Sequence, residues 1–446
     1  MTLKQLYDWD PASHGEVYLA YVVPTAQVQM SSGIPISTKY AYQDPLSRKD
    51  NDLQARIFAQ VVPQHFGMIA GKMNLIMFDL DAEHGQGFDP QPRIDTAEVM
   101  DQYAEHQRPL TTYVQKASDI VLPPKAVLAV SCPMDCLEHL PAAVPPEAHY
   151  RALSKRELAF SGLPTPHSIV VDTVLDVDQV RDSSLRAIEV TRMLHFVEGK
   201  APQYVVKLPL ASAGQGTFLI RNEADRFEAL AVLRPEVDRM LLQLNQTNEH
   251  LNPASFVIQE MVAGSAMAVS LFLTKSGELI VTSCCDQFVD PSGRWGGGHI
   301  DYPQQSRLKA EYLPVANTLA TYMHSLGYYG PLGADIMTDS DGKHLIIDLN
   351  TRVTGSQPLG FLKGYFSAKR GFHNAAVFFP LLLDVTLKEF KHRFRKECEQ
   401  GRIVVAGWCH ARGGKSSVTA IIIAGEDQAR LGALAERVKA LKTQGY

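Results

Sequence analysis

The sequence predicts a mixed α/β and α+β protein in three parts, and three observations carry this prediction. Apolar, β-branched runs alternate with polar linkers in the first part of the chain. Predicted strands follow one another closely in the middle part, where an Asp-Ser-Asp-Gly turn joins the last two. A helix and a small strand–strand–helix unit end the chain. We place the three parts at residues 1–147, 148–371 and 372–446.

The composition is that of an ordinary folded protein. The chain has 446 residues, 45% of them hydrophobic and 20% charged, and 43 basic against 48 acidic side chains give a net charge of −5. This balance excludes a disordered or fibrous chain. It also argues against nucleic acid or an anionic membrane as a partner, because both are bound through cationic surfaces.

No targeting or membrane segment is evident. The N-terminus lacks a basic stretch followed by an apolar run, and the longest apolar run, near Ala375–Val385, is too short for a span and contains Pro380. The six cysteines form no zinc pattern. We therefore expect reduced thiols and a cytoplasmic location. A homodimer is compatible with the sequence.

The first part contains three predicted strands, Val17–Val23, Met73–Leu80 and Ala126–Pro133. No glycine-rich fingerprint follows any of them, so we predict no dinucleotide site there. A proline-rich stretch, Leu140–His149, marks the end of this part.

The middle part is predicted to begin with a helix from Tyr150 to Gly162. Two more predicted helices lie at about Glu223–Leu244 and Arg307–Leu326. The predicted strands are Val205–Leu210, Thr217–Ile220, Ser255–Val262, Met267–Thr274, Glu278–Cys285, Leu332–Thr338 and His344–Asn350.

Lys207 and the loop that follows it are suited to phosphate. A lysine at the end of a strand supplies a cation, and the sequence Ser-Ala-Gly-Gln-Gly of residues 212–216 lets backbone N–H groups close over the same oxygens. A second feature is the strand end at Gln259 and Glu260, where free backbone groups can bond to the edge of a purine. Each feature also has a simpler interpretation: the glycines could belong to an ordinary β-hairpin, and Gln259 and Glu260 could end a buried strand that binds nothing.

Three oxygen ligands lie on the last predicted hairpin. Asp348 and Asn350 project from the same face of one strand, and Asp335 lies beside them if its strand pairs across the turn. Two carboxylates and an amide on an apolar hairpin are costly unless a cation neutralises them. Hard oxygen ligands of this kind suit Mg²⁺ held against nucleotide phosphates.

The order of these features resembles the ATP-grasp superfamily, over roughly Tyr150 to Gly360. The segment GADIMTDSDGKHLIIDLNTRVTG is the most specific part of the match. The resemblance implies a pre-ATP-grasp N-terminal domain, two lobes that bind ATP and Mg²⁺ between them, and a ligase that activates a carboxylate as an acylphosphate.

The resemblance also implies roles for particular residues. Lys207 would hold phosphate, Ser212, Gly214 and Gly216 would form a lid, and Arg352 would stabilise charge on the acylphosphate. The adenine contacts would come from Gln259, Glu260 and Val262, and the Mg²⁺ ligands would be Asp335, Asp348 and Asn350.

Three positions depart from the family pattern. Arg151 stands where a phosphate-binding lysine is usual, and Lys155, one turn away, is the alternative. Ala266 replaces a ribose-binding glutamate, and Asp348 replaces the bridging glutamate, which leaves one or two Mg²⁺ open.

The segment from Asp286 to Pro303 is predicted to be a glycine-rich loop that closes over the substrates. Arg294, Trp295 and His299 within it are candidate substrate contacts, as are Gly355 and Ser356 after Arg352. A merely flexible connection is the alternative.

We thus predict an ATP-dependent ligase that joins a small carboxylic acid to an amine and releases ADP and phosphate. A carboxylate–thiol ligase, a carboxylase and a non-catalytic nucleotide-binding protein are the alternatives. The identities of the acid and the amine do not follow from the sequence.

Overall fold

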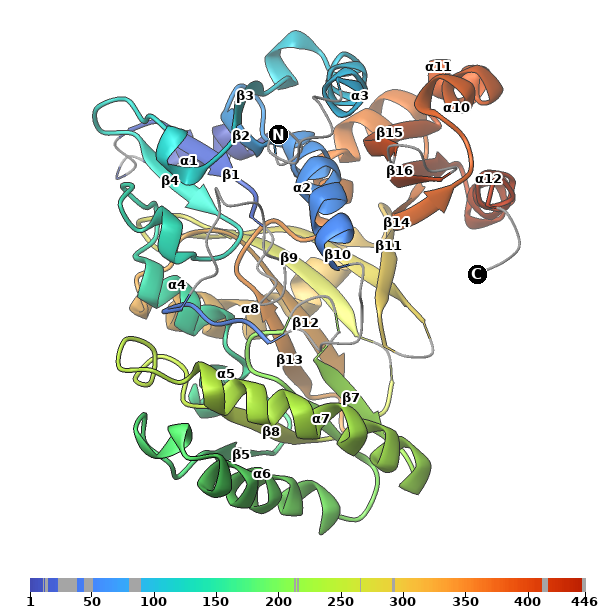
Figure 1. The fold of residues 1–446 in the computed structure, drawn as a ribbon. Helices are drawn as coiled ribbons and strands as arrows, with labels where there is room; N and C mark the ends of the chain where they lie inside the picture. Colours follow the sequence, from blue (N-terminus) through green and yellow to red (C-terminus); the bar gives the residue numbers. More distant parts are fainter. Residues whose placement is uncertain are drawn as a thin grey trace.

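A computed structural model describes residues 1–10, 12, 15–22, 38–43, 51–79, 90–211, 214, 216–264, 266–290, 293–410 and 416–442, without the side chains of residues 51–56. Three sheets organise this part of the chain: a parallel sheet near the N-terminus, a small antiparallel sheet and a large antiparallel sheet (Figure 1). The predicted mixed α/β fold class is confirmed.

The N-terminal sheet has the strand order β3-β2-β1-β4, with all neighbours parallel. Its strands are β1 Val17–Ala20, β2 Asn74–Phe78, β3 Leu110–Val114 and β4 Val127–Val130. The helices of this region are α1 Leu3–Trp9, α2 Asn51–Gly67, α3 Gln91–Met100 and α4 Pro146–Leu153. Short helical turns are η1 Glu105–Gln107, η2 Ala117–Asp119 and η3 Asp135–Leu137.

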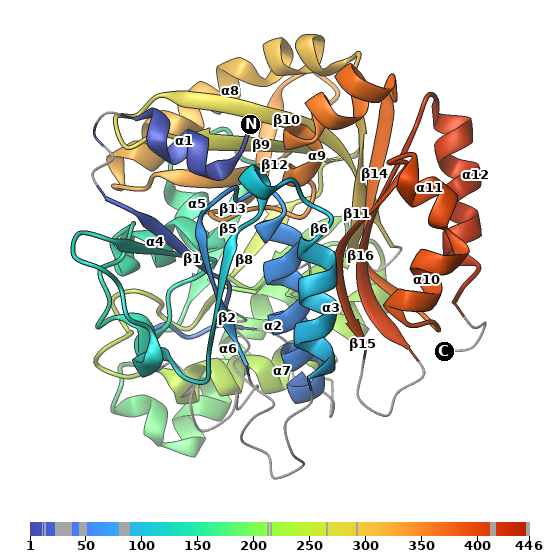
Figure 2. The same cartoon turned by 90° about the horizontal axis from the view of Figure 1, so that it is seen from above.

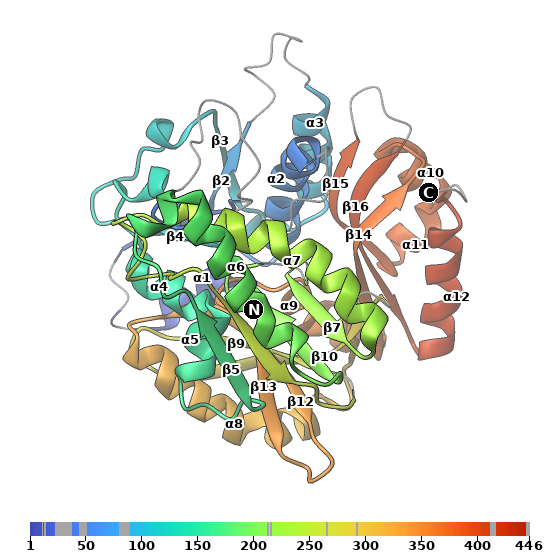
Figure 3. The same cartoon turned by 60° about the horizontal axis from the view of Figure 1, so that its bottom comes forward.

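The small antiparallel sheet has the order β5-β8-β6-β7. Its strands are β5 Ser168–Asp172, β6 Tyr204–Lys207, β7 Thr217–Ile220 and β8 Ser255–Glu260. Helices α6 Ser183–Glu198 and α7 Glu223–Gln243 lie side by side over one face of it, with the turn η4 Gln179–Arg181 before α6 (Figure 3). Met193 and Leu194 of α6 and Leu233 of α7 are fully buried against Phe256 of β8.

The helix predicted from Tyr150 to Gly162 is interrupted. The structure has α4 and then α5 Lys155–Phe160, separated at Ser154, which is extended and whose side chain accepts from the Glu157 N–H. This cap fixes the start of α5 and thereby the position of Lys155.

The large sheet has eight strands in the order β13-β12-β9-β10-β11-β14-β16-β15. Its strands are β9 Met267–Leu273, β10 Leu279–Val289, β11 Trp295–Asp301, β12 Gly330–Thr338, β13 His344–Asn350, β14 Asn374–Leu383, β15 Ile403–His410 and β16 Ser417–Gly425. The helices that follow or cover it are α8 Gln305–Ser325, α9 Gln357–Phe361, η5 Gly364–Ala368, α10 Leu387–Arg393, α11 Arg395–Glu399 and α12 Gln428–Lys439.

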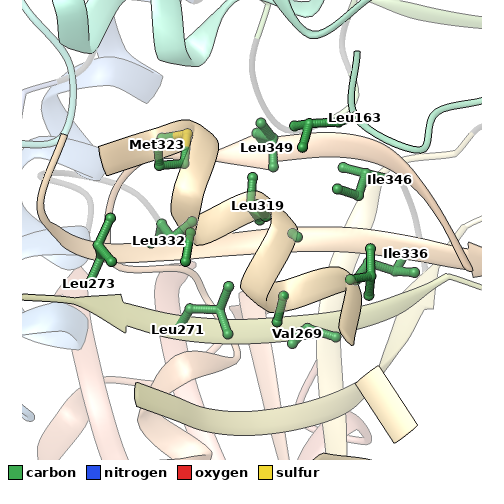
Figure 4. Close-up of a cluster of buried hydrophobic side chains, with 14 of the residues drawn as sticks. Leu163, Val269, Leu271, Leu273, Leu319, Met323, Leu332, Ile336, Ile346 and Leu349 are labelled. Atoms are coloured by element: carbon green, nitrogen blue, oxygen red, sulfur yellow. The ribbon is translucent and has the colours of Figure 1, made fainter. Parts of the chain in front are cut away.

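Helix α8 closes a core against β9, β12 and β13. Leu319 and Met323 of α8 point onto Leu271 and Leu332, and each of these side chains is fully buried (Figure 4). Truncating one of them to alanine would cost about 2–5 kcal/mol. This core packs against one face of the β12–β13 hairpin and holds it in place.

The described residues of the glycine-rich segment from Asp286 to Pro303, which are all but 291 and 292, form mainly paired strands, so the predicted loop was wrong over most of its length. Strands β10 and β11 pair through it, from Asp286↔His299 to Val289↔Trp295. The glycines serve close packing: Gly297 has φ +146°, and a Cβ there would lie 2.0 Å from the Val377 carbonyl oxygen of β14.

Residues after 372 continue the large sheet. The chain first forms β14 and only then the helices α10 and α11, whereas the sequence predicted a helix alone. The run from Ala375 to Phe378 forms this strand because it is buried between β11 and β16. The boundary near residue 372 stays a prediction.

Helices α2 and α3 pack on β15, so the N-terminal region contacts the far end of the large sheet (Figure 2). Gln64 of α2 bridges the two, since its Nε2 donates to the Trp408 carbonyl at 3.0 Å and its Oε1 accepts from the Trp408 N–H at 2.8 Å. In the described ranges, no helix has the length and apolar character needed to cross a bilayer.

Candidate active site

A cavity of about 600 Å³ lies between the small sheet and the large sheet. We call it the main cavity. Volumes of this order are typical of small-molecule sites. Residues that line it include Lys207, Gln259, Glu260, Val262, Gly214, Asp335, Asp348, Asn350, Arg352, Trp295, Gly355 and Ser356. Residues predicted from three separate stretches of sequence thus meet at one place.

Lys207 ends β6 inside the main cavity. It is 6% exposed, and its Nζ donates to the Gln259 Oε1 at 2.7 Å and to the Ile347 carbonyl at 2.6 Å. Burial lowers the pKa of Lys207 to about 8, partly offset by the nearby charge of Asp348. The group therefore remains mainly protonated at neutral pH, with one ammonium hydrogen left for a further acceptor.

The three predicted metal ligands lie together on the β12–β13 hairpin. Asp335 pairs with Asp348, and Gly333 pairs with Asn350. Burial, and then the negative charge of Asp348, raises the pKa of Asp335 to about 7. Two carboxylates held this closely are stabilised by a cation between them. The third ligand is an amide, and no cluster of three or more His, Cys, Asp or Glu occurs in the described part of the chain.

Lys155 lies at this site and Arg151 does not. The Lys155 Nζ is 3.1 Å from the Asp348 Oδ1 and donates to the Ala211 carbonyl at 3.1 Å. Neither Lys155 nor Arg151 lines the main cavity itself, but Lys155 contacts Asp348, which does, whereas Arg151 is exposed on α4. The geometry favours Lys155 over Arg151, opposite to the preference drawn from the family spacing.

The predicted lid reaches the main cavity at Gly214. The Leu208 N–H donates to the Gly216 carbonyl at 2.8 Å, which closes the turn between β6 and β7. Gly214 packs against Gly293 at the end of the β10–β11 hairpin. Ser212 lies outside the described residues.

The strand end at β8 has the groups expected for a purine edge. Gln259 is buried, and its Nε2 donates to the Ser168 Oγ at 3.2 Å, so its side chain is held by β5 and Lys207. Glu260 and Val262 line the main cavity where β8 ends. Ala266 also lines it, and as an apolar side chain it offers no contact to a ribose hydroxyl.

Arg352 lines the main cavity, and it interacts there with Tyr21 of the N-terminal region. Burial raises the pKa of Tyr21, and the Arg352 guanidinium acts in the opposite direction. No carboxylate of the described residues forms an ion pair with Arg352. A half-buried guanidinium without a carboxylate is suited to an anionic ligand.

The five predicted substrate contacts divide into two groups. Trp295, Gly355 and Ser356 line the main cavity. Arg294 is exposed and does not line it, and His299 is buried within β11, 3.0 Å from the Asn374 Oδ1 and 3.4 Å from the Asp286 Oδ2. A substrate role for Arg294 or His299 is therefore not supported.

Several residues of the site were missed. Gln287 donates to the Asp335 Oδ1 at 2.8 Å, and His65 of α2 donates from Nε2 to the Gly355 carbonyl at 2.9 Å. Phe66 of α2 and Phe379 of β14 also line the main cavity. No motif marks these positions, because tertiary packing alone brings them to the site.

A family model, described as an ATP-grasp domain, matches residues 185–356. The chain contains an ATP-grasp domain. The match spans Lys207, the β12–β13 hairpin and Arg352, and it supports the predicted cofactors ATP and Mg²⁺, which enzymes with this domain use.

Solved structures show the same fold over nearly the whole chain. The ADP complex of N5-carboxyaminoimidazole ribonucleotide synthetase has a TM-score of 0.53 at 12% identity and covers 95% of this chain and 96% of that chain. Phosphoribosylamine–glycine ligase from Thermotoga maritima has a TM-score of 0.51 at 12% identity, with 96% of each chain covered. At such low identity these structures establish the ATP-grasp fold alone.

A curated relative is similar over a shorter stretch. The [butirosin acyl-carrier protein]–L-glutamate ligase of Niallia circulans is 26% identical over 151 residues, which are 34% of this chain and 33% of that protein. The chain thus matches about a third of that relative's length.

Proposed function

We propose that the protein is an ATP-dependent ligase that joins a carboxylic acid to an amine and releases ADP and phosphate. One observation carries the proposal: Lys207, Lys155, the Asp335–Asp348–Asn350 set and Arg352 line or border a single cavity. An acid oxygen would attack the γ-phosphorus of ATP, ADP would leave, and the amine nitrogen would then displace phosphate from the acyl carbon.

The residues divide the work along the main cavity. Gln259, Glu260 and Val262 would hold the adenine, and Lys207 and Lys155 would bind the phosphates. Lys155 also bonds to the residue before the glycine-rich turn, so it links the phosphate site to the lid. Gly214 and Gly216 would complete the lid above the phosphates.

The Asp335, Asp348 and Asn350 side chains fit Mg²⁺. All are oxygen ligands on paired strands, and burial, followed by the negative charge of Asp348, which a divalent ion would offset, raises the pKa of Asp335. When bound, Mg²⁺ would offset negative charge on the phosphate oxygens. Gln287 would orient Asp335 through its 2.8 Å hydrogen bond.

Arg352 would face the acid and the phosphoryl group that is transferred to it. Its forked, permanent charge suits the non-bridging oxygens of an acylphosphate, where negative charge develops. Trp295 and the Gly355–Ser356 segment would enclose the reacting atoms and exclude water.

A carrier-protein thiol is an alternative acceptor, and the name of the Niallia circulans relative favours keeping it. The two products differ chemically, since neutral hydroxylamine cleaves a thioester and leaves an amide intact. Cytoplasmic location and a homodimer stay predictions.

Product analysis tests the proposal. The protein would be incubated with ATP, Mg²⁺ and pools of carboxylic acids and amines, and nucleotide products and new masses would be followed. We expect ADP, phosphate and a condensed product, and AMP with pyrophosphate would contradict the acylphosphate route. Lys207→Ala should abolish turnover, whereas Lys388→Ala, on the exposed face of α10, should leave it unchanged.

A further inference from the structure

A second, smaller cavity opens beside Arg352. Its volume is about 60 Å³, and it lies between the N-terminal sheet and the segment around Arg352. We call it the side chamber. Tyr21, Phe66, Arg352 and Val353 line both the side chamber and the main cavity, so the two spaces adjoin at the residue proposed to face the acid.

The walls of the side chamber are mainly apolar. Leu19 of β1, Ala129 and Val130 of β4, and Tyr328 and Tyr329 before β12 all line it. An apolar tail that leaves water for these walls is stabilised by the hydrophobic effect in proportion to the apolar surface that it buries.

Arg352 is the one permanently charged side chain among the described residues that line the side chamber. His149 also lines it, but its Nε2 donates to the Thr351 carbonyl at 2.8 Å, and burial lowers its pKa to about 4. Ser131 donates to the Val22 carbonyl at 2.8 Å and accepts from the Val22 N–H at 3.1 Å. Apart from Arg352, the described residues of this lining supply no permanent cation that would neutralise a second negative charge on a substrate.

The volume limits the size of what enters. An apolar cavity of ~150 Å³ accommodates benzene, so the side chamber is too small for an aromatic ring and suits a few aliphatic carbons. The buried Thr351 Oγ1, which has no hydrogen-bond partner among the described residues, offers a polar contact at the wall, and tyrosines of the lining also carry hydroxyl groups.

We propose that the acid substrate carries a short, uncharged aliphatic tail that enters the side chamber while its carboxylate faces Arg352. This inference rests on the ligase function proposed above. It specifies the class of acid substrate, whereas the position of the ATP site alone does not specify that class.

Trapping with hydroxylamine tests this class without knowledge of the natural amine. The acid and ATP give acylphosphate and ADP. The hydroxylamine nitrogen then attacks the acyl carbon, phosphate leaves with the bonding electrons, and a proton lost from nitrogen completes the acyl hydroxamate. ADP and hydroxamate would be measured for nearly isosteric acids: L-leucine against L-aspartate and L-asparagine, and 4-methylpentanoate against succinate.

We expect the aliphatic member of each set to be preferred in kcat/KM by on the order of 100-fold, because a buried, unpaired carboxylate or amide is costly. Equal or greater turnover of aspartate or succinate would overturn the tail class while leaving the ligase function intact. Absence of ADP and hydroxamate with every acid, despite ATP binding, would instead contradict the ligase function.

Two variants locate the tail. Ala129→Leu fills the side chamber and should raise the KM for leucine by roughly 10-fold or more, with much less effect on alanine or on ATP. Ala104→Leu, at an exposed position after α3, is the matched control. Leu19→Ala, at the residue of β1 that pairs with Ala129, enlarges the chamber and should shift the preference toward phenylalanine. This variant provides the test if Ala129→Leu fails to fold, and an unchanged preference in Leu19→Ala would place the tail elsewhere.

Discussion

The Lys155 Nζ lies 3.1 Å from the Asp348 Oδ1. The ammonium group of Lys155, at the start of α5, thus contacts one of the proposed metal ligands. Lys155 is 9% exposed and also holds the Ala211 carbonyl at 3.1 Å. This one side chain therefore links α5, the glycine-rich turn and the β12–β13 hairpin.

Replacing Lys155 should weaken nucleotide binding more than replacing Arg151. Lys155→Met removes a buried cation from the phosphate site, and we expect the Kd for ATP to rise by about 10-fold or more. Arg151→Met, at an exposed position, should change it less than about 2-fold. Isothermal titration calorimetry with Mg²⁺ and ATP measures both, and the reverse ranking would restore Arg151 as the phosphate contact.

The metal set should govern the Mg²⁺ requirement. Asp335→Asn removes one of two facing carboxylates, so we expect the Mg²⁺ concentration for half-maximal ADP release to rise by roughly 10- to 100-fold. Asp341→Asn, at the exposed tip of the same hairpin, is the matched control. Equal Mg²⁺ dependence in both variants would remove Asp335 from the ligand set.

The hairpin ligands could be predicted from sequence because strand pairing is a local rule. The short turn after Thr338 brings Asp335 near Asp348, and a register shift between Asp335 and Ile336 then pairs the two residues directly. Lys207 and Gln259 also lie on neighbouring strands, β6 and β8, but β7 and α7 separate these strands in the chain, so this pairing is not a local one. The ATP-grasp domain could thus be predicted from features of its own strands.

The rest of the site depends on contacts between distant segments. Phe66 and His65 reach the cavity from α2, through packing of the N-terminal region on the large sheet. The run Gly296–Gly298 suggested a loop, but those glycines let β11 lie close to β14. Composition alone does not distinguish a flexible glycine from one that permits close packing.

His65 should make stability depend on pH. Burial lowers the pKa of His65 to about 4, while its Nε2 donates to the Gly355 carbonyl at 2.9 Å and its Nδ1 has no partner among the residues that the structure describes. The folded state thus resists protonation, and the stability present above the unfolded pKa of about 6.5 is lost as the pH falls toward 4.

His65→Gln removes this titration and keeps a donor near the Gly355 carbonyl. The loss of unfolding free energy between pH 7.5 and pH 5 should become smaller by about 2 kcal/mol. Urea unfolding at the two pH values measures it, with His167→Gln, at an exposed histidine, as the control. His149, which has a similarly lowered pKa, should account for part of the dependence that remains. An unchanged slope in His65→Gln would show that His65 is not the titrating group.

The close contact between Gly355 and Trp295 should be required to position the groups of the main cavity that would enclose the substrates. A Cβ at Gly355 would lie 2.1 Å from the Trp295 Cη2, so Gly355→Ala must displace the indole or the segment after Arg352. We expect kcat to fall by on the order of 100-fold, since small misplacements of positioning groups are costly, with the KM for ATP nearly unchanged. Trp295→Leu in the same chain removes the clash and should recover part of kcat relative to Gly355→Ala alone. If the double variant is no more active than Gly355→Ala, the alanine acts through something other than the indole, and the contact does not order the site.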